Sequence, residues 1–147
     1  MTARIGVNLL WLVPGEVGGS EGWAAGVLQA VAADAPPDLA VVAFATAAVI
    51  DAHRWLAEAF EVVLVPGPVG PSRPLRVAAE SSWLAVAARR AKVDVLHHPG
   101  GTIPVLRATP AIVTIHDLQP LALPRPLRHC QSSLGAAASA APTSSSA

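Results

Sequence analysis

The chain has 147 residues, about the length of one domain. Hydrophobic residues make up 52% of it and charged residues only 14%, so a disordered or polyelectrolyte chain is excluded and a packed core is expected. Ten basic residues balance ten acidic ones, and this neutral balance does not favour nucleic acid or a polybasic membrane contact. The single cysteine, Cys130, cannot form an intramolecular disulfide, which fits a reducing compartment and predicts a cytoplasmic location.

The apolar segments are too short to cross a membrane. The longest uncharged apolar run in the body of the chain covers residues 39–50, between Asp38 and Asp51. A membrane-spanning helix needs about 20 such residues. We therefore expect no transmembrane segment.

Five apolar runs predict buried strands, and the segments between them predict helices. The predicted strands cover residues 5–13, 39–46, 61–65, 93–97 and 111–115. The predicted helices cover residues 21–33, with Ser20 as the cap, residues 47–60 and residues 74–91. This alternation predicts an α/β fold, a Rossmann-like doubly wound parallel sheet of about five strands.

The sequence changes character at residue 128. Residues 131–147 carry no charge and no aromatic ring, and they cannot bury enough apolar surface to offset their ordering entropy. We expect a domain over residues 1–127 and a disordered tail over residues 128–147. An alanine-rich helix over residues 135–141 is the alternative for the tail.

A glycine-rich loop follows the first predicted strand, at the edge where open parallel sheets bind ligands. In it, Gly18, Gly19 and Ser20 precede a helix whose N-terminus can hold a phosphate. The alternative is a simple tight turn, because the spacing G-x-G-x-x-G is absent. No acidic residue ends the second strand either, so a dinucleotide oxidoreductase is disfavoured and we expect no cofactor.

Histidines follow the fourth and fifth predicted strands. His97 and His98 precede Gly100, and His116 precedes Asp117, which places an imidazole beside a carboxylate. Adjacent strand residues point to opposite faces and no third ligand is suitably spaced, so we expect no metal site. The alternative for the last pair is a histidine satisfied by backbone and an aspartate that caps the next turn.

Several of these segments together resemble the N-terminal domain of a family 4 glycosyltransferase of the GT-B type. They are residues 4–7, the glycine loop at 15–21, residues 94–98 and residues 110–121. The most specific part is a strand ending in VTIHDL, followed by Pro120 and Pro124. The resemblance covers residues 3–127 and does not extend into the tail.

The resemblance implies retaining transfer of a sugar from a nucleotide-sugar donor to a glycosyl acceptor, in a cleft between two Rossmann-like domains. It implies that the glycine loop contacts the donor diphosphate. It also implies that His116 lies beside the transferred sugar, with Asp117 fixing the local turn. The candidate lining groups for acceptor or sugar are His97, His98 and Gly100.

The chain departs from the family in having no second domain with a nucleotide pocket. We therefore expect a truncated or frame-shifted product that is inactive alone, because half of the cleft is missing. We also expect the exposed fifth strand to promote self-association. The alternatives are a stand-alone α/β module that binds phosphate or sugar, a subunit that pairs with a separate C-terminal domain, and a fragment that does not fold stably.

Overall fold

The computed structural model describes residues 2–67, 69, 72–104 and 109–116. The elements in these ranges are β1 (Ala3–Asn8), α1 (Gly19–Asp34), β2 (Leu39–Ala45), α2 (Ala47–Ala52), α3 (Trp55–Ala59), β3 (Glu61–Leu64), α4 (Arg73–Ser81), α5 (Trp83–Arg90), β4 (Val95–His98) and β5 (Ala111–Val113). No helix in these ranges has both the length and the apolar character needed to cross a bilayer. The predicted domain boundary after residue 127 and the predicted tail lie outside the described residues.

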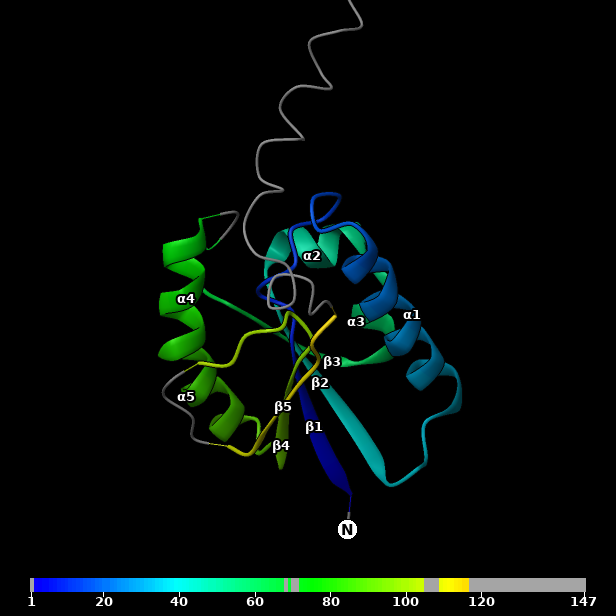
Figure 1. Ribbon diagram of the computed structural model, residues 1–147. Coiled ribbons are helices and arrows are strands. Elements are labelled where there is room, and N and C mark those ends of the chain that lie inside the picture. The colour runs from blue at the N-terminus through cyan, green and yellow to red at the C-terminus, as the bar shows by residue number, and fades with distance from the viewer. Residues whose placement is uncertain (1, 68, 70–71, 105–108, 117–147) are drawn as a thin grey trace, which may run out of the picture. The chain divides into compact units, whose positions relative to one another are not determined.

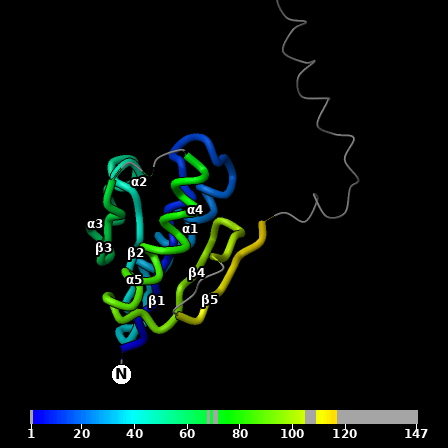
Figure 2. The backbone as a smooth tube through the Cα atoms, turned by 90° about the vertical axis from the view of Figure 1, so that its left-hand side faces the viewer, coloured from blue at the N-terminus to red at the C-terminus, as the bar shows by residue number. Residues whose placement is uncertain are grey.

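The five strands form one parallel sheet in the order β3-β2-β1-β4-β5, with β3 and β5 at opposite edges (Figure 2). The chain moves from β1 to β2 and β3 on one side, and then crosses back over β1 to form β4 and β5. Strand order therefore reverses between β1 and β4, which makes this position a topological switch point. The predicted Rossmann-like parallel sheet is confirmed.

Helices cover both faces of the sheet (Figure 1). Helices α1, α2 and α3 pack on one face through a core that includes Val7, Ala43 and Leu28. Helices α4 and α5 pack on the other face through a core that includes Phe44 and Leu84. The central strands are buried on both sides, which explains why their sequences are continuously apolar rather than alternating.

The first strand ends earlier than its apolar run. The sequence predicts a strand over residues 5–13, but β1 ends at Asn8 and residues 9–12 form a buried turn. The side chain of Asn8 explains the difference, because its Oδ1 accepts the N–H of Leu10 at 3.1 Å. An asparagine that bonds the backbone two residues ahead forms a turn in place of further strand pairing.

Two predicted helices are each divided in two. The helix predicted over residues 47–60 breaks at His53, whose Nε2 contacts Oε1 of Glu21 in α1 at 2.8 Å. The helix predicted over residues 74–91 breaks at Ser82, whose hydroxyl donates to the carbonyl of Ala78 at 2.6 Å. The backbone N–H of Ser82 donates to the same carbonyl at 3.0 Å, and a side-chain bond back to the preceding turn tends to bend a helix.

The ends of five other elements also differ from the predictions, and of these β2 and β3 each stop one residue short. Helix α1 begins at Gly19 with Gly18 at its N-cap, so the predicted cap at Ser20 is wrong. Strand β4 is shifted towards its carboxyl end relative to residues 93–97, and β5 stops short of the predicted residue 115. These shifts of one or two residues are typical at the ends of elements.

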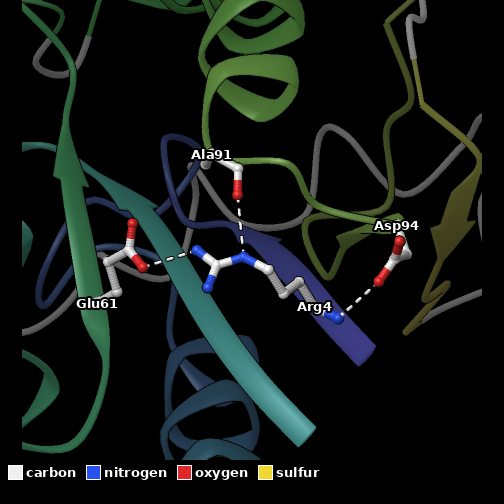
Figure 3. A network of polar contacts seen from close by, with 4 residues as sticks. All are labelled: Arg4, Glu61, Ala91 and Asp94. Carbon is white, nitrogen blue, oxygen red and sulfur yellow. Dashed lines mark hydrogen bonds and ion pairs between the residues drawn. The ribbon is translucent and has the colours of Figure 1, made fainter. Parts of the chain in front are cut away.

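Arg4 connects three elements at the amino end of β1 (Figure 3). Its Nη2 donates to Oε2 of Glu61 in β3 at 2.7 Å, and its Nε donates to the carbonyl of Ala91 after α5 at 3.0 Å. Its backbone N–H donates to Oδ2 of Asp94 at 2.7 Å. One arginine and two carboxylates thus connect the strands at this exposed end of the sheet.

Candidate functional site

Strands β1 and β4 lie side by side at the switch point, and their last residues are Asn8 and His98. Ligands of open α/β sheets bind outside the carboxyl ends of the strands at such a point. The glycine loop follows β1, the paired histidines end β4, and His116 follows β5 by three residues. The topology therefore brings the sequence-predicted groups that are described to one edge of the sheet.

A cluster of buried polar side chains lies at this edge, on the face of the sheet that α4 covers. Nδ2 of Asn8 lies 3.0 Å from Oε1 of Glu80 in α4 and 3.2 Å from Nδ1 of His98. The three residues are only 1%, 5% and 1% exposed, respectively. Burial raises the pKa of the Glu80 carboxyl, and the hydrogen bond from Asn8 and the charge of Arg76 oppose this effect. We call these three residues the Asn8 cluster.

Asn8 and Glu80 are not among the site residues that the sequence predicts. One signal was available for Asn8, because it is the only polar side chain in an otherwise apolar run at residues 5–13. Glu80 had no comparable signal, because a glutamate in an amphipathic helix is normally solvated. Its burial depends on how α4 packs against the sheet.

His97 points to the opposite face of the sheet from His98, as strand alternation requires. Its Nε2 lies 2.8 Å from the hydroxyl of Thr114, which follows β5. Burial lowers the pKa of His97, and the neighbouring His116 lowers it further. Because both effects lower its pKa, the His97 ring is favoured in its neutral form at neutral pH.

His116 is exposed, and its ring contacts two residues, Pro99 and Trp23. Its Nε2 lies 2.8 Å from the carbonyl of Pro99, and its ring meets the ring of Trp23 edge-on with centroids 4.8 Å apart. A carbonyl only accepts hydrogen bonds, so Nε2 carries the proton and Nδ1 is the acceptor of the neutral ring. Trp23 lies in α1, so His116 is placed beside the helix that begins at Gly19.

The glycine loop has a backbone that only glycine adopts readily. Gly18 has φ 60° and ψ −130°, and both Gly18 and Gly19 are exposed. The N–H of Gly15 donates to Oε2 of Glu21 at 2.8 Å, which ties the loop to the first turn of α1. This bond lowers the pKa of Glu21, and the contact with His53 lowers it further.

Ser20 and Gly100 have different surroundings. Ser20 is half-buried in the first turn of α1. Gly100 lies against the ring of Trp11, so close that a Cβ at this position would be 2.3 Å from Cγ of Trp11. Gly100 therefore lets the segment after β4 pack against the turn after β1.

The structure places His116 beside α1 and separates His97 from His98 by the thickness of the sheet. Asp117 lies outside the described residues. Within the described ranges, no three His, Cys, Asp or Glu side chains gather in a way that could hold a metal ion.

Comparisons of the chain with protein-family models, with curated proteins and with solved structures find no match.

Proposed function

We propose that this chain is the acceptor-side domain of a retaining glycosyltransferase, which holds the diphosphate of a nucleotide-sugar donor at Gly18 and Gly19 and the sugar at His116. The observation that carries the proposal is the contact between His116 and Trp23. Trp23 is four residues beyond Gly19, about 6 Å along the helix. The imidazole therefore contacts a residue about one turn from the helix N-terminus, an arrangement that suits a sugar attached to a diphosphate.

The chemistry of the two groups fits the two parts of such a donor. Backbone N–H groups and the positive end of α1 favour the anionic diphosphate, and they favour it more as charge develops on the leaving group. Nδ1 of His116 can accept a hydrogen bond from a sugar hydroxyl, since Nε2 is engaged by Pro99. In the proposal a second domain completes the cleft, and the chain acts in the cytoplasm.

A titration tests the diphosphate part. We expect uridine and guanosine diphosphate sugars to shift the amide resonances of Gly18 and Gly19 in the 147-residue chain. Gly19→Asp should weaken this binding about tenfold by charge repulsion, while the fold is retained because acids suit the first turn of a helix. The matched control is Gly26→Asp, at an exposed position of the same helix with open space around it. Equal binding by both variants would contradict the assignment of the loop.

A second variant tests the sugar part. His116→Ala should weaken binding of a nucleotide sugar severalfold and leave binding of pyrophosphate unchanged, because only the sugar contacts the imidazole. Equal losses for both ligands would mean that His116 acts on the loop and not on the sugar.

The alternative function is a binding module for phosphate or sugar that works alone or pairs with a separate C-terminal domain. It is favoured by the fact that the groups assigned here come from a single edge of a single sheet. The same titration separates the two functions. The module predicts that a simple sugar phosphate binds as tightly as a nucleotide sugar.

We also propose that the edge of β5 pairs with a second copy of the chain. Within the part of the chain that the structure describes, strand β5 is paired only with β4, and Ile112 and Ile115 are 54% and 60% exposed. Exposed apolar edge strands tend to pair with other chains. Light scattering should detect a dimer that dissociates in Ile112→Lys, and a monomer at high concentration would overturn the proposal.

A further inference from the structure

The amide of Asn8 has one orientation that satisfies its neighbours. The N–H of Leu10 can only donate, so the amide atom facing it at 3.1 Å must be the oxygen. Nδ2 then faces both Glu80 and His98 and donates one hydrogen to each. Asn8 thus links strand β1, helix α4 and the end of β4.

This orientation fixes the protonation of the His98 ring. Because Nδ2 of Asn8 donates to Nδ1 of His98, Nδ1 must carry a lone pair. The proton of the neutral ring is therefore on Nε2. A histidine held in one tautomer by a buried neighbour also has a fixed ring orientation.

The cluster is connected to both segments that carry the candidate ligand groups. Through Leu10, Asn8 sets the start of the turn that leads to the glycine loop. Through His98, it anchors the end of β4, where the carbonyl of His98 accepts the N–H of Thr114. The next residue, Pro99, supplies the carbonyl that holds His116.

Burying the polar groups of the Asn8 cluster has a desolvation cost, which offsets much of the stability that their hydrogen bonds contribute. Glu80 makes no ion pair within the described ranges, and Arg76, whose charge lowers the pKa of Glu80, lies one turn away on the same helix. Replacing both partners of a buried hydrogen bond by apolar groups of the same shape can be nearly neutral or stabilising. A buried polar cluster at the carboxyl ends of β1 and β4 is better explained by its effect on the positions of the segments that follow these strands.

We propose that Asn8 and Glu80 are positioning residues for the ligand site, and that they act through His98 and Leu10 on His116 and on the glycine loop. The inference rests on the proposed function, because it assigns these residues to the same site. Neither side chain is expected to touch the ligand. Their effect is to hold the two segments in the geometry that binds it.

Three substitutions separate positioning from general stability. Glu80→Leu removes the acceptor for Asn8 and should weaken binding of a nucleotide sugar about tenfold. Because it also leaves one hydrogen of the Asn8 amide unsatisfied, the melting temperature should fall, and the affinity is measured well below it. Glu80→Gln keeps an oxygen for Asn8 and should restore the affinity to within about twofold of the parent. Glu58→Leu, the matched change at an exposed position of α3, should alter neither affinity nor the His98 ring. Unchanged affinity in folded Glu80→Leu overturns the inference.

Nitrogen-15 spectroscopy of the His98 ring gives a readout that needs no ligand. In the parent chain, Nδ1 should show the shift of an unprotonated ring nitrogen and Nε2 that of a protonated one. Asn8→Asp keeps an oxygen for Leu10 but turns the second atom into an acceptor, so the proton should move to Nδ1. A protonated Nδ1 in the parent chain overturns the inference even if Glu80→Leu does not fold.

The two proposals can fail separately. If the parent chain binds neither nucleotide sugar nor pyrophosphate, the proposed function is wrong. The inference is then judged on the free chain, where Glu80→Leu should still shift the resonances of His116, Gly18 and Gly19. If the parent binds and Glu80→Leu binds equally well, the proposed function stands and the positioning role is wrong.

Discussion

The two ends of β1 hold polar groups in opposite ways. At the amino end, the charge of Arg4 is matched by Glu61, and their side chains are 31% and 52% exposed. At the carboxyl end, Asn8 bridges a buried carboxyl and a buried imidazole. The exposed ion pair and the buried polar cluster are thus formed by residues only four positions apart in the same strand. The charges at the amino end remain partly hydrated, whereas the polar groups at the carboxyl end depend on each other for hydrogen bonds.

This difference indicates which end of the sheet tolerates the loss of a polar side chain. Water replaces a lost partner at the amino end, so an exposed ion pair contributes little to stability. No water is available to groups that are 1% to 5% exposed, so each lost partner at the carboxyl end leaves an unsatisfied atom. The edge proposed to bind the ligand is therefore also the edge where the loss of a polar partner should cost more stability.

The largest effect is expected for Asn8→Ala. This change leaves the N–H of Leu10, the Glu80 carboxyl and Nδ1 of His98 without their shared partner. We expect the free energy of unfolding to fall by about 3 kcal/mol in a urea titration. The matched control, Gln29→Ala at an exposed position of α1, should change it by less than about 0.5 kcal/mol. Similar losses for both would remove the contrast between buried and exposed polar groups.

Gly100→Ala should have the next largest effect. The added Cβ would overlap the Trp11 ring, whose nearest atom is 2.3 Å away, so the segment after β4 must move. We expect a loss of about 2 kcal/mol, measured by the same titration. Gly26→Ala in α1 meets nothing within 4 Å and should instead stabilise the chain by about 0.5 to 1 kcal/mol. If Gly100→Ala leaves the free energy of unfolding unchanged, the segment after β4 and the Trp11 ring can move apart at little cost.

The same contrast separates what the sequence predicts from what it does not. The apolar runs predict the parallel sheet because strands buried on both faces have a characteristic composition. The glycine loop and His116 are candidates from the sequence because they follow the predicted strands at residues 5–13 and 111–115. The Asn8 cluster is not predicted, because Glu80 is 72 residues away from Asn8 in the chain and no local pattern reports their contact. Local patterns also miss the breaks at His53 and Ser82, which depend on individual side-chain bonds.

The pH dependence of stability should distinguish two buried or partly buried glutamates. Folding raises the pKa of Glu80, so the native chain binds this proton more tightly than the unfolded chain. Stability then falls as pH rises from the unfolded pKa through the folded pKa. Glu80→Gln removes this loss, so the variant should match the parent at low pH and exceed it at neutral pH.

Glu21 provides the control of opposite sign. Its pKa is lowered in the folded chain, so its contribution is present above the unfolded pKa and is lost as pH falls through the folded pKa. Glu21→Gln should therefore be less stable than the parent at neutral pH, and the difference should vanish in acid. Thermal unfolding across the acid-to-neutral range measures both variants. A parallel response would mean that burial of Glu80 does not control its protonation.

The smallest effect is expected for Arg4→Ala, at the open end of the sheet. The change removes the bonds to Glu61 and Ala91 but keeps the backbone bond to Asp94. We expect a loss of about 1 kcal/mol or less, and this loss should shrink between about 0.05 M and 1 M sodium chloride because salt screens exposed charges. The loss in Asn8→Ala should not depend on salt, since its partners are buried. A salt-independent loss in Arg4→Ala that equals the loss in Asn8→Ala would mean that both ends of β1 are equally constrained.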